Sequence, residues 1–222
     1  MFIKTLTNID KMSSLKRIFY LILISLFLYS AYWIYISFVF KNEVNNEIIR
    51  HGIQTQKIYV TGFPYRLEAH ITNLSLEKEA ENFFSINVPQ IKISVSPFSF
   101  KKIFIQSNSS NLKYRSFTQN IDIFNKQGRL SIKIENGLIQ RSTFMFEENN
   151  IIAKNIILGE FNKNFSNIIL DGKVNVIDKK IEGNFQLDIY DEDKQKKFSA
   201  PMKINDNKLK ILFFELDLNS LF

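Results

Sequence analysis

The sequence predicts a mainly β protein, in which an N-terminal transmembrane helix precedes a long-stranded antiparallel sheet. Three observations predict this fold class. Residues 18–40 contain no charged side chain. From Gln56 onward apolar and polar residues alternate with a period of two, which is typical of antiparallel strands with one buried face. Turn residues such as Asn136-Gly137 separate the alternating runs. We expect the sheet to form either a curved groove or a sandwich-like meander.

The apolar segment at residues 18–40 is long enough to cross a membrane. As a helix it would reach about 34 Å, against a hydrocarbon core of about 30 Å. Tyr29, Tyr32, Trp33 and Tyr35 crowd its second half, as interfacial aromatics do. A cleaved signal peptide is the alternative, but its apolar region would be shorter and would end at an Ala-x-Ala-like site. The sequence therefore predicts an uncleaved signal anchor.

Charge beside the helix predicts its orientation. Residues 1–17 contain Lys4, Lys11, Lys16 and Arg17 against Asp10 alone, whereas the charges just after residue 40 cancel. The positive-inside tendency places residues 1–17 in the cytoplasm. We expect a single-pass protein of the inner membrane with a periplasmic C-terminal domain. The expected segments are a basic tail (1–17), the anchor (18–40), a juxtamembrane helix extension (41–52) that ends near Gly52, and the β domain (53–222).

Alternation within the β domain identifies a candidate apolar face and candidate turns. The candidate groove residues are Leu67, Ile71, Ile132, Phe185, Leu187, Ile189 and Phe214. The expected turns include Glu148-Asn149-Asn150, Asp171-Gly172 and the charged tip Asp191-Glu192-Asp193.

Residue chemistry gives no support for an enzyme. The chain contains no cysteine and two histidines, so thiolate nucleophiles and cysteine metal sites are excluded. His70 follows Glu68 on the polar side of a strand, but nothing nearby in sequence proposes a nucleophile, and an exposed strand histidine is the favoured interpretation. No phosphate-binding loop, nucleophile elbow or metalloprotease helix occurs. We expect no catalytic residue, no metal and no cofactor. The net charge of +7 is spread along the chain, so no nucleic-acid partner is expected either.

The segment "VTGFPYRL" combines five residues that suit a sharp corner: Gly62, Phe63, Pro64, Tyr65 and Arg66. Glycine permits backbone angles that other residues resist, and Pro64 removes a ladder donor and pushes Phe63 towards extended geometry. A structural corner is the favoured interpretation. The alternative is an aromatic and basic surface that contacts lipid headgroups or a partner protein.

Several segments resemble a known family. A Tyr- and Trp-rich anchor, then Gly52 and "VTGFPYRL", "SINVPQIKISVSPFSFKKIFIQS" and "KINDNKLKILFFELDLNSLF" resemble the uncharacterised alphaproteobacterial envelope family catalogued as domain of unknown function 2125. The resemblance is clearest over residues 18–110 and returns at 200–222. The chain is shorter than many members, and its C-terminal segment lacks their Gly and Pro. The family has no established activity, so the resemblance implies location and architecture only.

Two hypotheses of function follow. The first is that a long curved sheet with one apolar face binds or handles lipid. In outline, a sheet tethered by an N-terminal helix resembles the AsmA-like envelope proteins. The alternative is a non-enzymatic envelope scaffold or protein-interaction module with a closed β core, and for it the Ser- and Asn-rich residues 107–111 suggest a contact loop. The expected partners are therefore the inner membrane, through the helix, and either lipid or envelope proteins.

Overall fold

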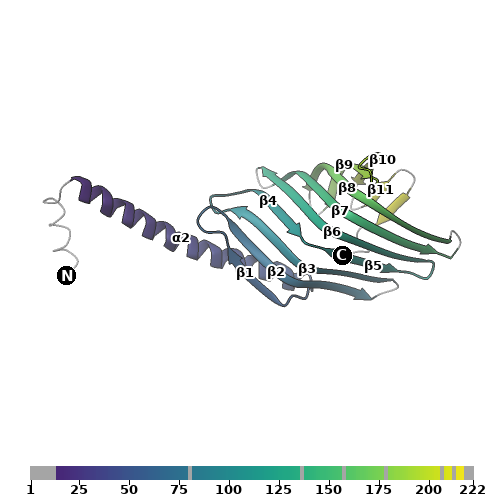
Figure 1. Cartoon of the computed structure of the whole chain (residues 1–222), viewed down its shortest axis with the longest axis horizontal. Coiled ribbons are helices and arrows are strands. Elements are labelled where there is room, and N and C mark those ends of the chain that lie inside the picture. Colours follow the sequence, from purple (N-terminus) through teal and green to yellow (C-terminus); the bar gives the residue numbers. More distant parts are fainter. Residues whose placement is uncertain are drawn as a thin grey trace.

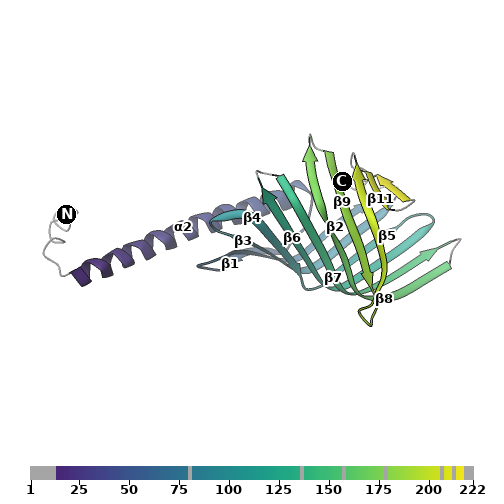
Figure 2. The same ribbon diagram turned by 90° about the horizontal axis from the view of Figure 1, so that it is seen from above.

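One helix and one antiparallel sheet make up the computed structural model, which describes residues 14–79, 82–135, 138–156, 159–177, 180–205, 208–211 and 214–217. The helix α2 (Ser14–Arg50) projects from the β1 edge of a strongly curved sheet (Figures 1 and 2). The mainly β fold class with an N-terminal apolar helix is thus confirmed.

Helix α2 is long and apolar enough over Lys16–Arg50 to cross a membrane. It ends in a Schellman motif: the N–H of Gly52 donates to Ile49 O at 3.0 Å, and the N–H of Ile53 donates to Ile48 O at 3.0 Å. Gly52 has a φ of 66°, in the region that favours glycine. The chain therefore turns directly from the helix into the sheet.

The sheet is an antiparallel meander of twelve strands among the described residues. The strands are β1 Lys57–Thr61, β2 Leu67–Glu79, β3 Phe83–Ser96, β4 Ser99–Ser107, β5 Ser110–Arg115, β6 Gln119–Glu135, β7 Leu138–Asn155, β8 Gly159–Ile177, β9 Lys180–Tyr190, β10 Lys196–Asn205, β11 Lys208–Ile211 and β12 Phe214–Asp217. Neighbours in sequence are neighbours in the sheet, except that β4 and β5 share one position between β3 and β6. The contact loop suggested for residues 107–111 is only the short connection at 108–109, because the flanking residues belong to β4 and β5.

Two of the expected turns are wrong. Glu148-Asn149-Asn150 lies inside β7, and Asp171-Gly172 lies inside β8. Glu148 does adopt a turn-like φ of 49°, but this bends the strand without reversing it. The charged tip at residues 191–193 is a true turn, closed by the N–H of Lys194 donating to Asp191 O at 3.0 Å. Asn136-Gly137 lies outside the described residues.

The long strands change which residues point to the inner face at a transverse crease, although their pairing does not shift. Asn73 in β2 has a φ of 51°, like Glu148 in β7, yet the pairing of β2 with β3 keeps its register on both sides. The apolar residues of β2 are Leu67, Ala69 and Ile71 before Asn73, all three buried, and Leu74 and Leu76 after it. The apolar set therefore changes from odd to even numbers and stays on one face.

The corner at 62–66 joins β1 to β2. Gly62 has a φ of 102°, and a Cβ there would lie 2.7 Å from Arg66 O. The N–H of Arg66 donates to Gly62 O at 2.9 Å, and the Phe63–Pro64 peptide bond is cis. Only glycine fits the start of this tight turn.

We predict that Gly62→Ala destabilises the chain more than Gly52→Ala. Both positions have positive φ, so each alanine costs about 1–2 kcal/mol of unfolding free energy. At Gly52 nothing lies within 4 Å of the added Cβ, whereas at Gly62 the carbonyl of Arg66 must also move. Urea unfolding of the full chain in detergent micelles, followed by circular dichroism, measures both losses. Equal losses would mean that the corner relaxes freely around the new methyl group.

Candidate functional site

Three cross-strand rows of apolar side chains run across eight strands on one face, which we call the inner face. The first row is Leu67, Val95, Ile103, Ile132, Ser142, Gly172, Phe185 and Met202. The second is Ala69, Ile93, Ile105, Leu130, Phe144, Leu170, Leu187 and Ala200. The third is Ile71, Ile91, Ser107, Gly128, Phe146, Ile168, Ile189 and Phe198. Together they form a strip of about 34 Å by 13 Å, from strand spacing and rise.

The pairing brings together most of the groove residues expected from sequence. Leu67, Ile132 and Phe185 belong to the first row, Leu187 belongs to the second, and Ile71 and Ile189 belong to the third. Phe214 begins β12, but its side chain lies outside the described part of the chain. Residues far apart in sequence thus line one surface, because antiparallel partners always point to the same side of a sheet.

The first two rows are buried at both ends of the strip and less buried at most positions between. Leu67 and Ala69 are 0% exposed at the β2 end, and Phe185 and Met202 are 7% and 8% exposed at the other end. The central side chains are only half-buried: Ile132, Leu130, Phe144, Leu170 and Leu187. No second sheet packs on them within the described residues. A partly exposed apolar strip of this size matches the largest apolar patch of a typical monomer, which is often a binding site.

Glycine makes room for an aromatic ring within the strip. A Cβ at Gly172 would lie 2.6 Å from Cδ1 of Phe185, and one at Gly183 would lie 2.8 Å from its Cε2. The Phe185 ring therefore packs against two glycines, and it protrudes less from the inner face than it would over larger residues.

The opposite, outer face is polar and carries ion pairs. On β7 and β8, Arg141 donates to Asp171 at 3.0 Å and 2.5 Å, and Thr143 donates to the same carboxylate at 2.6 Å. The hydrogen bond from Arg141 holds the pKa of Asp171 below its usual value. On β9 and β10, the hydrogen bond from Lys196 lowers the pKa of Asp188 in the same way. Both carboxylates stay ionised at neutral pH and keep this face in water.

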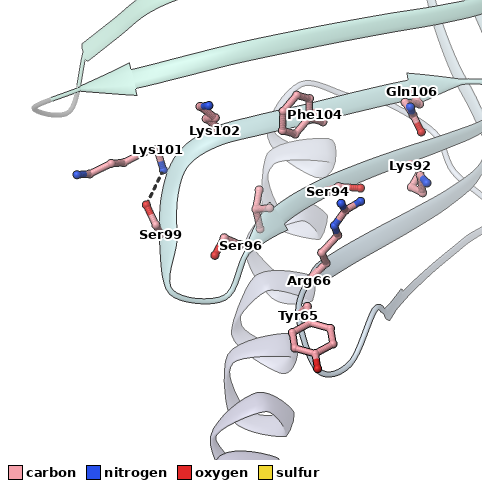
Figure 3. A pocket seen from close by; sticks show the side chains of 11 residues that line it. Tyr65, Arg66, Lys92, Ser94, Ser96, Ser99, Lys101, Lys102, Phe104 and Gln106 are labelled. Carbon is pink, nitrogen blue, oxygen red and sulfur yellow. Dashed lines mark hydrogen bonds between the residues drawn. The ribbon is translucent and has the colours of Figure 1, made fainter.

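Helix α2 covers the β2 end of the inner face. Figure 3 shows the helix behind the strands from which Lys92, Ser94 and Gln106 project on the outer side. Its less exposed positions recur at helical spacing: Tyr29, Trp33, Ile36, Phe40, Val44 and Ile48. This stripe packs along β1 and β2 and explains why the first residues of each row are fully buried.

Three aromatic side chains of α2 hold the two turns nearest the anchor. The hydroxyl of Tyr29 donates to Pro64 O, the hydroxyl of Tyr32 donates to Pro97 O at 2.8 Å, and Nε1 of Trp33 donates to Arg66 O at 3.4 Å. The rings pack as well: Trp33 meets Phe63 edge-on at 5.4 Å between centroids, and Tyr29 stacks on Phe98 at 5.8 Å. The corner thus joins two strands and also receives the helix.

This contact changes the interpretation of the helix aromatics. Sequence reasoning assigned Tyr29, Tyr32 and Trp33 to the membrane interface and did not anticipate that they bind the corner. Their spacing of three and four places Tyr29 on the same helix face as Tyr32 and Trp33, which is the available signal for a packing surface. Nothing local in sequence shows that "GFPYR" and "SPF" are the partners.

His70 has a packing role. Its ring stacks on Tyr59 at 4.8 Å between centroids, and its Nε2 lies 2.9 Å from Thr61 Oγ1 and 4.0 Å from Glu68 Oε2. In the part of the chain that the structure describes, no group of three His, Cys, Asp or Glu side chains lies close enough together to hold a metal ion.

Comparisons with family models, with curated proteins and with solved structures found no match for this chain. The resemblance to the alphaproteobacterial envelope family therefore stays a prediction.

We predict that the double variant Tyr29→Phe, Tyr32→Phe loosens both turns. Each change removes one hydrogen bond to a backbone carbonyl, worth about 0.5–1.5 kcal/mol, and leaves the ring in place. Hydrogen exchange of the full chain in micelles should become faster around residues 62–67 and 95–99. Tyr35→Phe is the matched control, because Tyr35 is 66% exposed on the other side of the helix. Unchanged exchange in the double variant would mean that ring packing alone holds the turns.

Proposed function

We propose that this chain is a membrane-anchored, non-enzymatic protein of the cell envelope that binds or handles lipid on the inner face of its sheet. One observation carries the proposal: the apolar strip has a half-buried centre, and no second layer lies over it among the residues that the structure describes. A lipid acyl chain spans about 15 Å, half of a hydrocarbon core of about 30 Å. The strip is long enough for such chains, and it begins beside the anchor helix.

The proposed location is the inner membrane, with α2 as a single anchor, the N-terminus in the cytoplasm and the sheet in the periplasm. The basic residues Lys16 and Arg17 at the start of the apolar segment support this orientation, because the charges near its other end cancel.

Photo-crosslinking tests the lipid proposal in cells. We predict that benzoylphenylalanine at Phe144, in the central strip, captures labelled phospholipid when irradiated. The matched control is the next residue, Met145, which points to the outer face of the same strand. Equal capture at both positions would mean non-specific contact with the membrane, and capture at neither would mean that the strip does not meet lipid.

A charge placed in the strip tests the same surface from the opposite direction. We predict that Leu187→Asp lowers the lipid capture at position 144 by about tenfold or more, because a carboxylate is costly in an apolar contact. Asn184→Asp is the control: it places the same charge on the outer face of the same strand, between Lys173 and Lys203. Circular dichroism checks that both variants fold. Undiminished capture in a folded Leu187→Asp protein contradicts the proposal.

Topology has its own test. We predict that protease added outside spheroplasts removes the chain beyond residue 40 and leaves a short anchored fragment. Full protection of the sheet domain would overturn the proposed orientation and the periplasmic location with it.

A scaffold function remains the second candidate, because an apolar tip lies at the end of the sheet far from the helix. Phe117 is 93% exposed and Ile156 is 73% exposed, and the N–H of Ile156 donates to Thr118 O at 3.2 Å. Such a tip suits contact with a protein. Benzoylphenylalanine at Phe117 that captures one protein, together with no lipid at position 144, would favour this function.

A further inference from the structure

The sheet contacts α2 within the apolar run of the helix. If that run spans the membrane, part of the sheet must also lie within the membrane. The two turns at 62–66 and 97–98 are level with helix residues 29–33, as their hydrogen bonds show. If the apolar run ends at Phe40, those helix residues lie about 10–16 Å inside its far end for an upright helix. A tilted helix makes the depth smaller. We propose that the two turns insert into the distal leaflet of the membrane that α2 crosses.

The exposed side chains at these turns suit lipid. Tyr65 is 80% exposed, Phe98 is 70% exposed, and Phe63 and Phe100 are about half exposed. Phe63 and Tyr65 lie between β1 and β2, Phe98 lies between β3 and β4, and Phe100 follows in β4. Both connections lie at the end of the sheet nearest the projecting part of α2 (Figure 1). Phenylalanine is favourable among acyl chains, and tyrosine favours the boundary between acyl chains and headgroups. In water, this cluster would be an uncovered apolar patch.

The backbone of the turns is also prepared for a dry environment. Irregular backbone inside a bilayer is tolerated only when its polar groups have partners. Tyr29, Tyr32 and Trp33 supply donors to the carbonyls of Pro64, Pro97 and Arg66. Both prolines lack an N–H, so no donor is left at those two positions. The helix and the prolines thus satisfy or remove several of the backbone polar groups that the turns would otherwise expose to lipid.

Basic side chains border the same end on the outer face. Arg66, Lys92, Lys101 and Lys102 line a cavity of about 680 Å³, together with Tyr65 and Phe104 (Figure 3). Lysine and arginine have long apolar stems that let their charges reach the headgroup layer from below. Opposite charge makes anionic phospholipid phosphates their partner in that layer. The turns and the basic cavity together form one membrane-contact surface.

This inference requires α2 to span the bilayer, but it does not require the strip to bind lipid. The test uses the full chain in nanodiscs of phosphatidylcholine and phosphatidylglycerol. Since the chain has no cysteine, single variants give clean thiol signals. The insertion variants are Tyr65→Cys and Phe98→Cys. Glu192→Cys, at the exposed β9–β10 tip, reports an aqueous thiol, and Ser25→Cys reports the free part of the anchor.

A charged, water-soluble methanethiosulfonate should react at positions 65 and 98 at least tenfold more slowly than at position 192. Protein packing cannot account for such protection, because both side chains are mostly exposed in the structure. Rapid reaction at 65 and 98 with a protected Ser25→Cys would overturn the insertion and leave the anchor intact. Rapid reaction at position 25 as well would overturn the anchor and the inference together.

Discussion

The contact between α2 and the two proline turns fixes where every other part of the chain lies. Among the described residues no second layer packs on the inner face of the sheet, so its first strands depend on the helix for cover. Tyr29 and Trp33 fix the position of the helix along its axis relative to the corner at 62–66. The less exposed helix residues that follow, up to Ile48, pack over β2. The Schellman end at Gly52 then returns the chain to pair as β1. Anchor and sheet therefore form one unit with a defined mutual position.

Helix α2 covers the inner face mainly at β1 and β2. The rest of the apolar strip is left partly exposed, and this part is the candidate site. Leu67 is fully buried beneath α2, whereas Ile132, in the same cross-strand row, is half-buried. The outer face needs no such cover, because its ion pairs are well solvated. The inner face does need it, since its rows are almost wholly apolar. Under the proposed function, lipid is the molecule that covers this surface.

The faces of the strands could be predicted from the sequence, because they depend on the local period of each strand. Contacts between segments far apart in the chain could not. Alternation placed six groove residues on one face, because the period of two is a property of each strand alone. The turns expected at Glu148-Asn149-Asn150 and at Asp171-Gly172 failed for different reasons. Glu148 bends the strand as an Asn-rich cluster suggests, but long pairing on both sides keeps the strand running. Gly172 serves the packing of Phe185, which is 13 residues away and unseen from a local pattern. The docking of Tyr29 and Trp33 is likewise a tertiary contact that propensity cannot report.

The transverse crease sets the outer limit of the apolar strip. Beyond the third row, the inner face meets a row in which Ser110, Asn125 and Asn149 are polar and the next partner, Phe165, is apolar. Asn125 and Asn149 are 4% and 2% exposed; each amide donates once, to Ser110 Oγ and to Phe146 O, and each Oδ1 lacks a protein partner. Buried acceptors of this kind are costly when left unpaired. An acyl chain would lose by lying across them, whereas a ligand group or a water molecule that donates a hydrogen bond would gain. Under the proposed function, the crease confines acyl chains to the three rows between it and the corner at 62–66, so that a chain lies across the strands and leaves its polar end free to reach the crease.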